Sequence, residues 1–469
     1  MSLNRREFAA TASLAGMALA AGSVQAAEKE ASAPKQDSPS RSKKEPLRVG
    51  FIGLGNRGDQ VHDAFLQQPD VKITAVCDMY QPYLDFAAKK VQEKQGHEPF
   101  QTKDYKELLK RADVDAVAIC TPDHWHGLMT AHALLADKDV YVEKPLGINI
   151  AEGRKLVDLA KQKNKIVQVG IQRKSSALCR EVVERIQAGD IGRVSAVRCF
   201  HVQNETPHGI GSPADSDPPE GFDWDAWQGP AKEHAYNKNR GFYRFRWFYD
   251  YSGGQLTNFG VHYLCLIHWA LGVSAPHSVM AMGGKYVNYD NREVPDTLEV
   301  VWTYPTKQGD TLVTFSQFNA TGQGGAARPC EVEFRGTKGT LYFTTSGYEI
   351  VPDNITPNEF PARSPIDREL ERGYRKGSKS EIEPLKIAGK VLDGDHARNF
   401  VDAVKTRTEP SCPLEFGHRV TTAAQMANIA LRTKQYLLWD AEKEQFTNND
   451  AANAYLAAEY RKGYEWPKT

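Results

Sequence analysis

Cysteine is scarce in this chain, with seven residues among 469. Because the number is odd and the spacing is wide, the cysteines cannot form the disulfide framework of a small secreted domain. A surplus of charge of one sign is also missing, since 59 lysines and arginines balance 59 aspartates and glutamates. This balance gives no electrostatic reason to bind nucleic acid or an anionic membrane. The remaining composition, 41% hydrophobic, is that of a globular chain with room for two or three domains.

The N-terminus lacks a hydrophobic run long enough to span a bilayer, because its apolar stretch covers only residues 9–21. Arg5 and Arg6 precede this stretch, and small residues follow it at 24–26. A charged start, a short apolar middle and a small-residue cleavage site are typical of an export signal, and the paired arginines resemble a twin-arginine signal. The competing interpretation is an amphipathic start to the first domain. We expect a periplasmic or otherwise exported protein, carried by the twin-arginine machinery, without stable membrane insertion.

A phosphate-binding unit follows. Residues 47–52 read as a short buried strand, and Gly53-Leu54-Gly55-Asn56-Arg57-Gly58 leads from it into a helical stretch at 61–66. In this order, the first glycine permits the tight turn, the second lets the backbone approach a pyrophosphate and the third lets the helix pack on the strand. The helix N-terminus then presents unpaired N–H groups to the phosphates. The expected cofactor contacts here are Gly53, Gly55, Asn56, Arg57 and Gly58.

The second strand, residues 72–77, ends at Asp78, which lies 20 residues after Gly58. A carboxylate at this place can accept hydrogen bonds from the adenosine ribose and repels a 2′-phosphate, so NAD is preferred over NADP. Arg57 leaves NADP open, because its side chain can reach a 2′-phosphate if it turns that way. FAD and S-adenosylmethionine are the competing ligands for such a turn.

Two further strands carry polar residues at their ends. Residues 115–120 form one, followed by Thr121-Pro122 and a helix start that contains Asp123 near the N-cap, His124 and His126. The two histidines are two residues apart and therefore do not share a helix face, so a metal site is not expected. Residues 139–142 form the other strand and deliver Glu143-Lys144-Pro145 at its C-terminal end, where ligands bind in open α/β sheets.

With these motifs in this order, the chain resembles the Gfo/Idh/MocA oxidoreductases. The resemblance covers roughly residues 47–440 and rests on six pieces: Gly53–Gly58, Asp78, Thr121-Pro122 with His126, Glu143-Lys144-Pro145, Val169–Arg173 and Gly253–His262. It implies a Rossmann domain that binds NAD, then an α+β domain with a large, mostly antiparallel open sheet that binds substrate and often builds homodimers or tetramers. It adds to the expected cofactor contacts Thr121, Pro122, His126, Glu143, Lys144 and Gln172.

The resemblance also implies catalytic roles. Lys144 is expected beside the nicotinamide, where it holds and polarises the substrate oxygen. Asn258 and His262 are four residues apart, so both side chains can project from one helix face, with His262 as the base. The family commonly has aspartate where Asn258 stands, and often another where Cys265 stands. An amide orients a hydroxyl but supplies no negative charge.

An aromatic and basic stretch at 222–230 and 240–251 suits carbohydrate, whose C–H faces stack on rings while its hydroxyls need polar partners. A packed loop is the alternative for each residue. Downstream, 297–304, 311–318, 331–334 and 340–343 alternate as strands, 352–390 reads as a surface excursion, and 394–405 and 418–434 read as helices that return to the first domain. The expected substrate contacts are Arg173, Tyr243, Arg246, Trp247, Tyr249, Asn258 and His262.

The sequence therefore predicts an α/β fold with two domains. The expected boundaries are a signal peptide at 1–26, a disordered linker at 27–46, a Rossmann domain at 47–168, a substrate and oligomerisation domain at 169–440 and a C-terminal tail at 441–469. The expected function is NAD-dependent hydride transfer at a secondary hydroxyl of a sugar, polyol or glycoside. One alternative is glycoside cleavage by transient oxidation and elimination, which regenerates NAD in place. The other is a non-catalytic sugar-binding or cofactor-binding protein.

Overall fold

The computed structural model describes residues 45–323, 328–361, 365–366 and 368–468. The described residues, from Glu45 onward, belong to one compact unit. The predicted signal peptide and all but the end of the predicted linker lie outside the described residues. Among the described helices, none is both long enough and apolar enough to cross a membrane.

The first domain is built on a six-stranded parallel sheet in the order β3-β2-β1-β4-β5-β6. Its strands are short and almost wholly buried, because helices cover both faces, which is the arrangement that a run of apolar residues predicts. The strand order reverses between β1 and β4, and ligands bind at such a switch point. The strands are β1 Leu47–Ile52, β2 Val71–Cys77, β3 Phe100–Thr102, β4 Ala116–Ile119, β5 Asp139–Glu143 and β6 Val167–Gly170.

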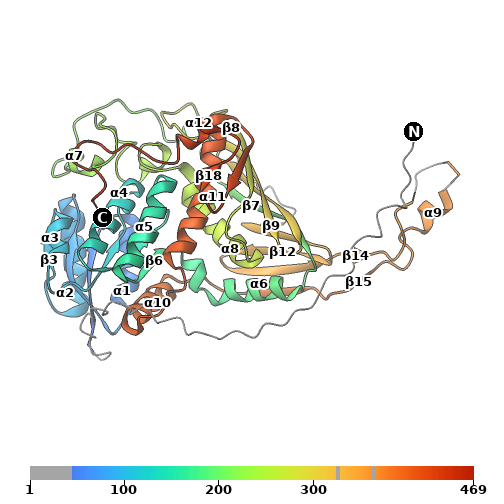
Figure 1. Cartoon of the computed structure of the whole chain (residues 1–469), viewed down its shortest axis with the longest axis horizontal. Helices are drawn as coiled ribbons and strands as arrows, with labels where there is room; N and C mark the ends of the chain where they lie inside the picture. The colour runs from blue at the N-terminus through green and yellow to red at the C-terminus, as the bar shows by residue number, and fades with distance from the viewer. Residues whose placement is uncertain (1–44, 324–327, 362–364, 367, 469) are drawn as a thin grey trace, which may run out of the picture. The chain divides into compact units, whose positions relative to one another are not determined.

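Helices connect these strands and lie with them on the left of Figure 1, in blue to blue-green. Helix α1 begins at Asn56, directly after the glycine turn, and α4 begins at Asp123, directly after Thr121-Pro122. Both helix N-termini therefore reach the edge of the sheet where β1 and β4 end. The helices are α1 Asn56–Leu66, α2 Gln81–Gln95, α3 Tyr105–Leu109, α4 Asp123–Leu135 and α5 Ile150–Lys163.

The second domain contains a ten-stranded sheet in the order β16-β13-β12-β11-β7-β10-β9-β8-β17-β18. Among the described strands of this second sheet, only the β7–β10 pair is parallel, so the predicted large and mostly antiparallel sheet is confirmed. The strands are β7 Val194–Val202, β8 Ser278–Gly284, β9 Thr297–Thr306, β10 Gly309–Phe318, β11 Val332–Gly336, β12 Gly339–Thr344, β13 Gly347–Pro352, β16 Leu385–Ala388, β17 Leu437–Asp440 and β18 Gln445–Phe446.

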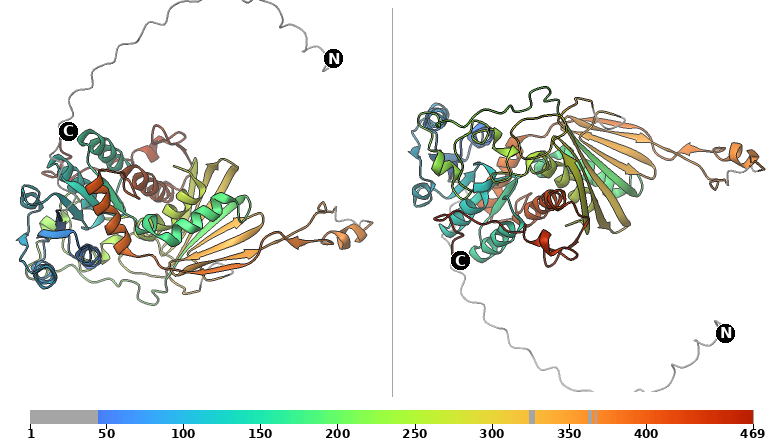
Figure 2. Two further views of the ribbon diagram at one scale, coloured as in Figure 1. Left: turned by 90° about the horizontal axis from the view of Figure 1, so that it is seen from below. Right: turned by 90° about the horizontal axis from the view of Figure 1, so that it is seen from above.

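One face of this sheet packs on helices α6 Ala177–Ala188, α8 Val261–Leu271 and α11 Leu414–Thr433 (Figures 1 and 2). Strand β9 shows the cause, since its alternate residues Leu298, Val300, Trp302 and Tyr304 are buried while their neighbours face outward. The Trp302 indole N–H donates to the backbone oxygen of Ala423 in α11, at 3.0 Å. The sheet is thereby joined to the helix layer by a polar bond as well as by apolar packing.

The C-terminal helices return to the first domain, as the sequence predicts. Helix α10, Asp393–Thr406, packs on α1 and places Phe400 between the rings of Phe65 and Tyr141. Helix α11 packs on α5. The predicted excursion at 352–390 projects from the body with β14 Asn354–Ile355, α9 Arg368–Gly373 and β15 Lys379–Ser380 (Figure 1). Its last part was not anticipated, because β16 pairs with β13 and forms an edge of the large sheet.

Candidate functional site

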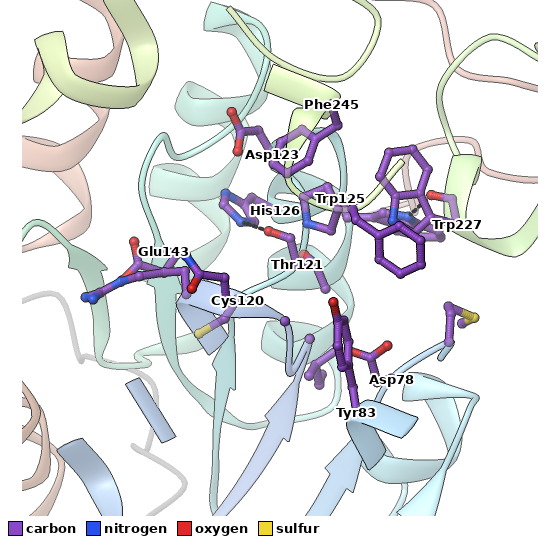
Figure 3. Close-up of a pocket in the computed structure, with 18 of the residues that line it drawn as sticks. Asp78, Tyr83, Cys120, Thr121, Asp123, Trp125, His126, Glu143, Trp227 and Phe245 are labelled. Atoms are coloured by element: carbon purple, nitrogen blue, oxygen red, sulfur yellow. Dashed lines mark hydrogen bonds and ion pairs between the residues drawn. The ribbon is translucent and has the colours of Figure 1, made fainter. Parts of the chain in front are cut away.

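A cavity of about 200 Å³ lies at the carboxyl ends of the first-domain strands, between them and the aromatic segment of the second domain (Figure 3). Residues that follow β1, β2, β4 and β5 line one side of it. The other side is formed by Phe222, Ala226, Trp227, Phe242, Tyr243, Phe245, Arg246 and Asn258. The site thus joins residues that are more than a hundred positions apart in the sequence.

The three glycines after β1 divide their tasks as the motif predicts. Gly53 adopts a φ of +86°, and a Cβ there would lie 2.7 Å from the backbone of Cys120 and Thr121. A Cβ on Gly58 would lie 2.1 Å from the Gly53 oxygen, so this glycine allows α1 to pack closely on the turn. A Cβ on Gly55 would meet only the edge of the Tyr83 ring, at 3.6 Å, among the described residues beyond its neighbours. Gly55 therefore leaves the open space that a pyrophosphate requires.

Asp78 lines the cavity at the end of β2 (Figure 3). Its carboxylate accepts hydrogen bonds from the backbone N–H groups of Leu54, at 2.7 Å, and Tyr80, at 2.9 Å. Burial raises the pKa of Asp78 to about 6, against the lowering effect of these donors. The two bonds fix the carboxylate beside the glycine turn, at the position from which it accepts hydrogen bonds from a ribose diol.

Arg57 does not point toward a 2′-phosphate. It donates to Glu143 through Nε, at 2.9 Å, and forms a two-bond ion pair with Asp393 of α10, at 2.9 and 3.0 Å. Burial opposes the charged form, but the two carboxylates outweigh it and raise the pKa of Arg57 above its usual value. The guanidinium is therefore committed to holding Glu143 and α10, which removes the sequence argument for NADP.

Lys144 follows β5 and donates through Nζ to Oδ1 of Asn258, at 2.9 Å. Asn258 in turn donates through Nδ2 to Oε1 of Gln255, at 3.0 Å. Burial lowers the pKa of Lys144 to about 8, although Glu143 and Asp123 act in the opposite direction. The structure thus brings two of the predicted catalytic side chains into direct contact at the cavity.

The Glu143 carboxylate, next to Lys144 in the sequence, accepts several hydrogen bonds. Its Oε1 accepts from Arg57, from Gln172 at 3.2 Å and from the Tyr141 hydroxyl at 3.3 Å, while Oε2 accepts from the Lys144 backbone N–H at 3.1 Å. Every one of these donors holds the carboxylate in place, so Glu143 fixes the loop that carries Lys144. Gln172, a predicted cofactor contact, reaches the site through Glu143 and does not line the cavity.

His262 and Asn258 differ in their relation to the cavity. Residues Leu256–Gly260 form a π-helical turn before α8, and a π-turn holds more residues per turn than the α-helix that we assumed. Asn258 therefore lines the cavity while His262 is absent from its lining. Burial, and after it the charges of Lys144 and Arg173, hold the pKa of His262 well below its usual value. Of the two side chains only Asn258 lines the described cavity, and the role of His262 as the base stays a prediction.

Thr121, Pro122 and His126 line the cavity, as predicted. The His126 ring lies between two backbone oxygens, with Nδ1 2.7 Å from Pro145 and Nε2 2.8 Å from Thr121. It ties the loop after β4 to the loop after β5. The Thr121 hydroxyl is buried without a hydrogen-bond partner among the described residues, so it remains available to a ligand. The described residues contain no cluster of three metal-ligating side chains.

The predicted substrate contacts separate into two groups. Tyr243 and Arg246 line the cavity, with the Arg246 guanidinium 3.9 Å from the Tyr243 ring centre. Three others do not line it. Trp247 is 6% exposed within the aromatic cluster, and Tyr249 stacks on Arg432 beside a second, smaller cavity. Arg173 is buried and paired with Glu331 of the second domain. The described cavity does not add support for these three substrate contacts, which stay predictions.

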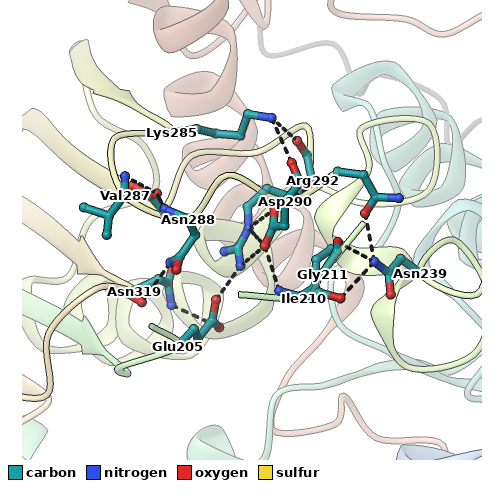
Figure 4. A network of polar contacts seen from close by, with 12 residues as sticks. Glu205, Ile210, Gly211, Asn239, Lys285, Val287, Asn288, Asp290, Arg292 and Asn319 are labelled. Atoms are coloured by element: carbon teal, nitrogen blue, oxygen red, sulfur yellow. Dashed lines mark hydrogen bonds and ion pairs between the residues drawn. The ribbon is translucent and has the colours of Figure 1, made fainter. Parts of the chain in front are cut away.

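The segment that carries Tyr243 is fixed from behind by a polar network (Figure 4). Buried Arg292, between β8 and β9, donates to Asp290 and, at 2.7 Å, to Glu205. Asn239 donates to the backbone oxygens of Ile210 and Gly211, each at 3.0 Å. These bonds join three loops of the second domain and thereby hold the aromatic segment that carries Tyr243 in place.

Several lining residues escaped the sequence analysis. Asp123 and Trp125 lie on α4, and Tyr80 and Tyr83 lie at the start of α2. The Tyr80 backbone pairs with that of Phe222, and the rings of Tyr80 and Phe242 are 5.3 Å apart. The aromatic richness of 222–251 was a signal for some of them, but nothing in the sequence predicted its contact with the loop after β2.

Family comparison agrees with this geometry. Residues 47–171 match the model of the Gfo/Idh/MocA oxidoreductase family described as an NAD-binding Rossmann fold. Residues 208–296 and 374–466 match the model of the C-terminal alpha/beta domain of the same oxidoreductase family. Together the matches cover more than half of the chain. The chain belongs to the Gfo/Idh/MocA oxidoreductase family. Its first domain is accordingly an NAD-binding Rossmann domain, as the glycine cradle and Asp78 indicate.

Curated relatives match over a limited part of this Gfo/Idh/MocA chain. A glycosyl hydrolase family 109 protein from Streptomyces filamentosus is 39% identical over 163 residues, which is 33% of each chain. An alpha-N-acetylgalactosaminidase from Shewanella oneidensis is 33% identical over 175 residues, which is 35% of this chain and 38% of the relative. The chain therefore matches only about a third of the length of these relatives.

Solved structures resemble this Gfo/Idh/MocA chain over most of its length. An oxidoreductase domain protein from Kribbella flavida is 19% identical with a TM-score of 0.61, covering 84% of this chain and 99% of its own. A scyllo-inositol dehydrogenase from Lactobacillus casei, solved with NAD(H) and scyllo-inositol bound, is 18% identical with a TM-score of 0.56 and the same coverage. At these identities the likeness establishes the fold.

Proposed function

We propose that this chain is an exported NAD-dependent oxidoreductase that transfers hydride between nicotinamide and a secondary hydroxyl of a sugar, polyol or glycoside. The observation that carries the proposal is the contact of Lys144 with Asn258 at the end of a cavity that also contains the glycine cradle and Asp78. When bound, NAD accepts or donates a hydride at nicotinamide C4. The aromatic wall opposite supports a carbohydrate substrate, because rings stack on sugar C–H faces.

In this mechanism Lys144 holds the reacting oxygen. Its ammonium donates to the substrate hydroxyl and stabilises the negative charge that develops there as the C–H bond breaks. Asn258 keeps Nζ in position, and its amide also serves as a hydrogen-bond partner for a neighbouring hydroxyl. Arg246 and Tyr243 lie where they contact the rest of the substrate.

The aromatic segment also supports tight retention of NAD. The ring centres of Phe222 and Phe242 lie 6.1 and 5.3 Å from that of Tyr80. These three rings line the end of the cavity that contains Asp78. A dinucleotide there leaves only if this cover moves. Tight binding of NAD is useful to an exported enzyme, because the protein then carries the cofactor with it from the compartment where it folds.

Export and self-association are parts of the proposal. The twin-arginine route transports folded proteins, and the seven unpaired cysteines support folding in a reducing compartment beforehand. Self-association is supported by exposed apolar side chains on the uncovered face of the large sheet, including Met280, Met282 and Leu312. Light scattering of wild type and of Leu312→Asp tests it, and a monomeric wild type contradicts it.

Redox-neutral glycoside cleavage is the second candidate. It is favoured by the identity to glycosyl hydrolase family 109 proteins and to an alpha-N-acetylgalactosaminidase, although that identity spans a third of their length. In this scheme a sugar hydroxyl is oxidised, the aglycone is eliminated, and the product is reduced again. A third reading, a non-catalytic sugar-binding or cofactor-binding protein, remains as an outcome of the test.

The test begins with protein purified in its native state. We expect NAD to copurify, identified by mass and absorbance. The loaded protein is then given polyols, free sugars and aryl glycosides, including N-acetylgalactosaminides. Lasting reduced nicotinamide supports the oxidoreductase, whereas aglycone release without net reduction supports the cleavage reaction. Binding of carbohydrate without either signal contradicts both and favours the binding protein.

A further inference from the structure

Three carboxylates line the described cavity, and two of them are already committed. Asp78 is held by two backbone N–H groups at the adenosine end. Glu143 accepts hydrogen bonds from four donors and supports the Lys144 loop. The third is Asp123, which the sequence analysis placed near a helix cap and gave no other role. Its side chain caps nothing, because Pro122 is the N-cap of α4.

Asp123 is positioned from both domains. It is the first residue of α4, 8% exposed, and its Oδ2 accepts a hydrogen bond from the Ser252 hydroxyl of the second domain. Figure 3 shows the carboxylate above His126 and beside Phe245, on the aromatic side of the cavity. Ser252 donates to one oxygen, and the other accepts no hydrogen bond from the described residues. The carboxylate therefore keeps the capacity to accept a further hydrogen bond.

The side chains that act electrostatically on Asp123 include residues that line the same cavity. Burial raises the pKa of Asp123, while the neighbouring side chains of His126, Lys144 and Arg246 and the Ser252 hydrogen bond lower it. Lys144 and Arg246 line the same cavity. Because burial makes this carboxylate more basic than an exposed one, it is better suited to accept a proton.

We propose that Asp123 is the proton acceptor of this site, a catalytic residue that touches the substrate hydroxyl held by Lys144. The inference rests on the proposed function. As the carbinol C–H bond breaks, its electron pair leaves as hydride for NAD, the O–H proton passes to the Asp123 carboxylate, and the C–O bond becomes a carbonyl. The Asp123 carboxylic acid then releases the proton to water. In the reverse direction the same acid protonates the carbonyl oxygen.

The other side chains fit this task less well. Asn258 carries an amide, which does not accept a proton at these pH values. Lys144 donates through Nζ to Asn258 and acts as the positive charge beside the oxygen. His262 is outside the cavity lining. Asp123 is thus the lining carboxylate that combines a free acceptor position with closeness to Lys144.

The test measures kcat against pH for NAD-loaded wild type and Asp123→Asn. We expect kcat to fall by about 100-fold or more, the usual contribution of a general base, with NAD affinity within twofold of wild type. The acidic limb of the profile disappears because it reports the carboxyl. Asp395→Asn is the matched control, since Asp395 also lies in the first turn of a helix but is exposed and outside the cavity. It leaves both kcat and the profile unchanged.

A second variant keeps the test decisive if Asp123→Asn does not fold. Ser252→Ala removes a hydrogen bond that lowers the pKa of Asp123, so the acidic limb moves to higher pH while the fold is kept. An Asp123→Asn enzyme with kcat within threefold of wild type and an unchanged limb overturns the inference and leaves the proposed function intact. A limb that persists in Asp123→Asn and vanishes in His262→Asn assigns the proton to His262 instead. A wild type that binds NAD and turns over no carbohydrate contradicts the proposed function itself.

Discussion

At the scale of single residues, the proposed reaction depends on one lysine that is half-buried and charged near neutrality. Lys144 sits between Glu143, which fixes its backbone, and Asn258, which fixes its ammonium. Burial brings its pKa down to about 8, so the charged form predominates near neutrality and is lost in mildly basic solution. A group tuned in this way is typical of active sites.

Replacing Lys144 therefore has a specific consequence. In Lys144→Met we expect kcat to fall by about 100-fold to 10,000-fold because the charge on the reacting oxygen is no longer stabilised. NAD affinity stays close to that of wild type. In the wild type, kcat declines above about pH 8 as the ammonium deprotonates. Steady-state kinetics measure kcat and its pH dependence, and fluorescence titration measures NAD affinity. A Lys144→Met variant with the kcat of wild type would show that Lys144 does not stabilise the reacting oxygen.

The glycine turn provides a matched pair of substitutions. Gly53→Ala places a side chain at a φ of +86° and against the Cys120 backbone, so it destabilises the fold by more than about 1 kcal/mol. Gly55→Ala fits the fold but fills the space beside Tyr83, so stability is kept and NAD binding weakens. Thermal unfolding with and without NAD separates the two. If both variants keep their stability and lose NAD binding equally, Gly53 and Gly55 do not have the separate roles assigned to them.

Residue roles were predictable where a contiguous motif fixes the backbone. Gly53, Gly55, Asp78 and Lys144 belong to such motifs, and the structure brings all four to one cavity. The ion pair of Arg173 with Glu331 was not predictable, because the two residues are distant in the sequence. No local pattern records such a partner.

At the scale of elements, the same division appears. The strands of both sheets follow the alternation and burial of their residues, so most of them were predictable. The π-helical turn at 256–260 was not, because its sequence carries no signal that separates it from an α-helix. It determines which side chains face the cavity, and it turns Asn258 inward. Strand β16 was missed because a short pairing at a sheet edge depends on its neighbour, β13.

The aromatic cover over the adenosine end is an element whose role can be measured. Phe242 is partly buried, stacks on Phe222 at 4.6 Å and faces Tyr80. In Phe242→Ala we expect NAD to dissociate about tenfold faster, equivalent to about 1.4 kcal/mol. Phe86→Ala is the control, because Phe86 is exposed on α2. Stopped-flow displacement measures the rate of NAD dissociation from wild type and the two variants. Identical rates in the three proteins would show that the aromatic cover does not retain the cofactor.

At the scale of the whole molecule, ion pairs join the first domain to the C-terminal part of the chain. Arg154 of α5 binds Glu415 of α11 at 2.8 and 2.9 Å and Glu444 at 2.8 and 3.1 Å. The Arg154 hydrogen bonds lower the pKa of Glu415 to about 2. Burial opposes the charged form of Glu444, but His418 and Arg154 lower its pKa to about 2 as well.

These depressed pKa values define how stability changes with pH. A carboxylate whose pKa is lower in the folded state contributes stability above its unfolded pKa, near 4.5, and loses it as the pH falls toward 2. We therefore expect Arg154→Met to be less stable than wild type at pH 5 and the difference to shrink on acidification. Lys89→Met, which breaks an exposed pair with Glu93 on α2, serves as the control. Urea unfolding measures the difference, and a constant gap between pH 5 and pH 2 contradicts this linkage.

The proposed reaction is tested most directly by mixing NAD-loaded protein rapidly with carbohydrate and following the absorbance of reduced nicotinamide. We expect a rise with at least one polyol, sugar or glycoside, lasting in a net oxidation and transient in a cleavage cycle, and absent from Lys144→Met. If NAD stays bound while no substrate of these classes produces the signal in the wild type, hydride transfer to carbohydrate is not what this site does.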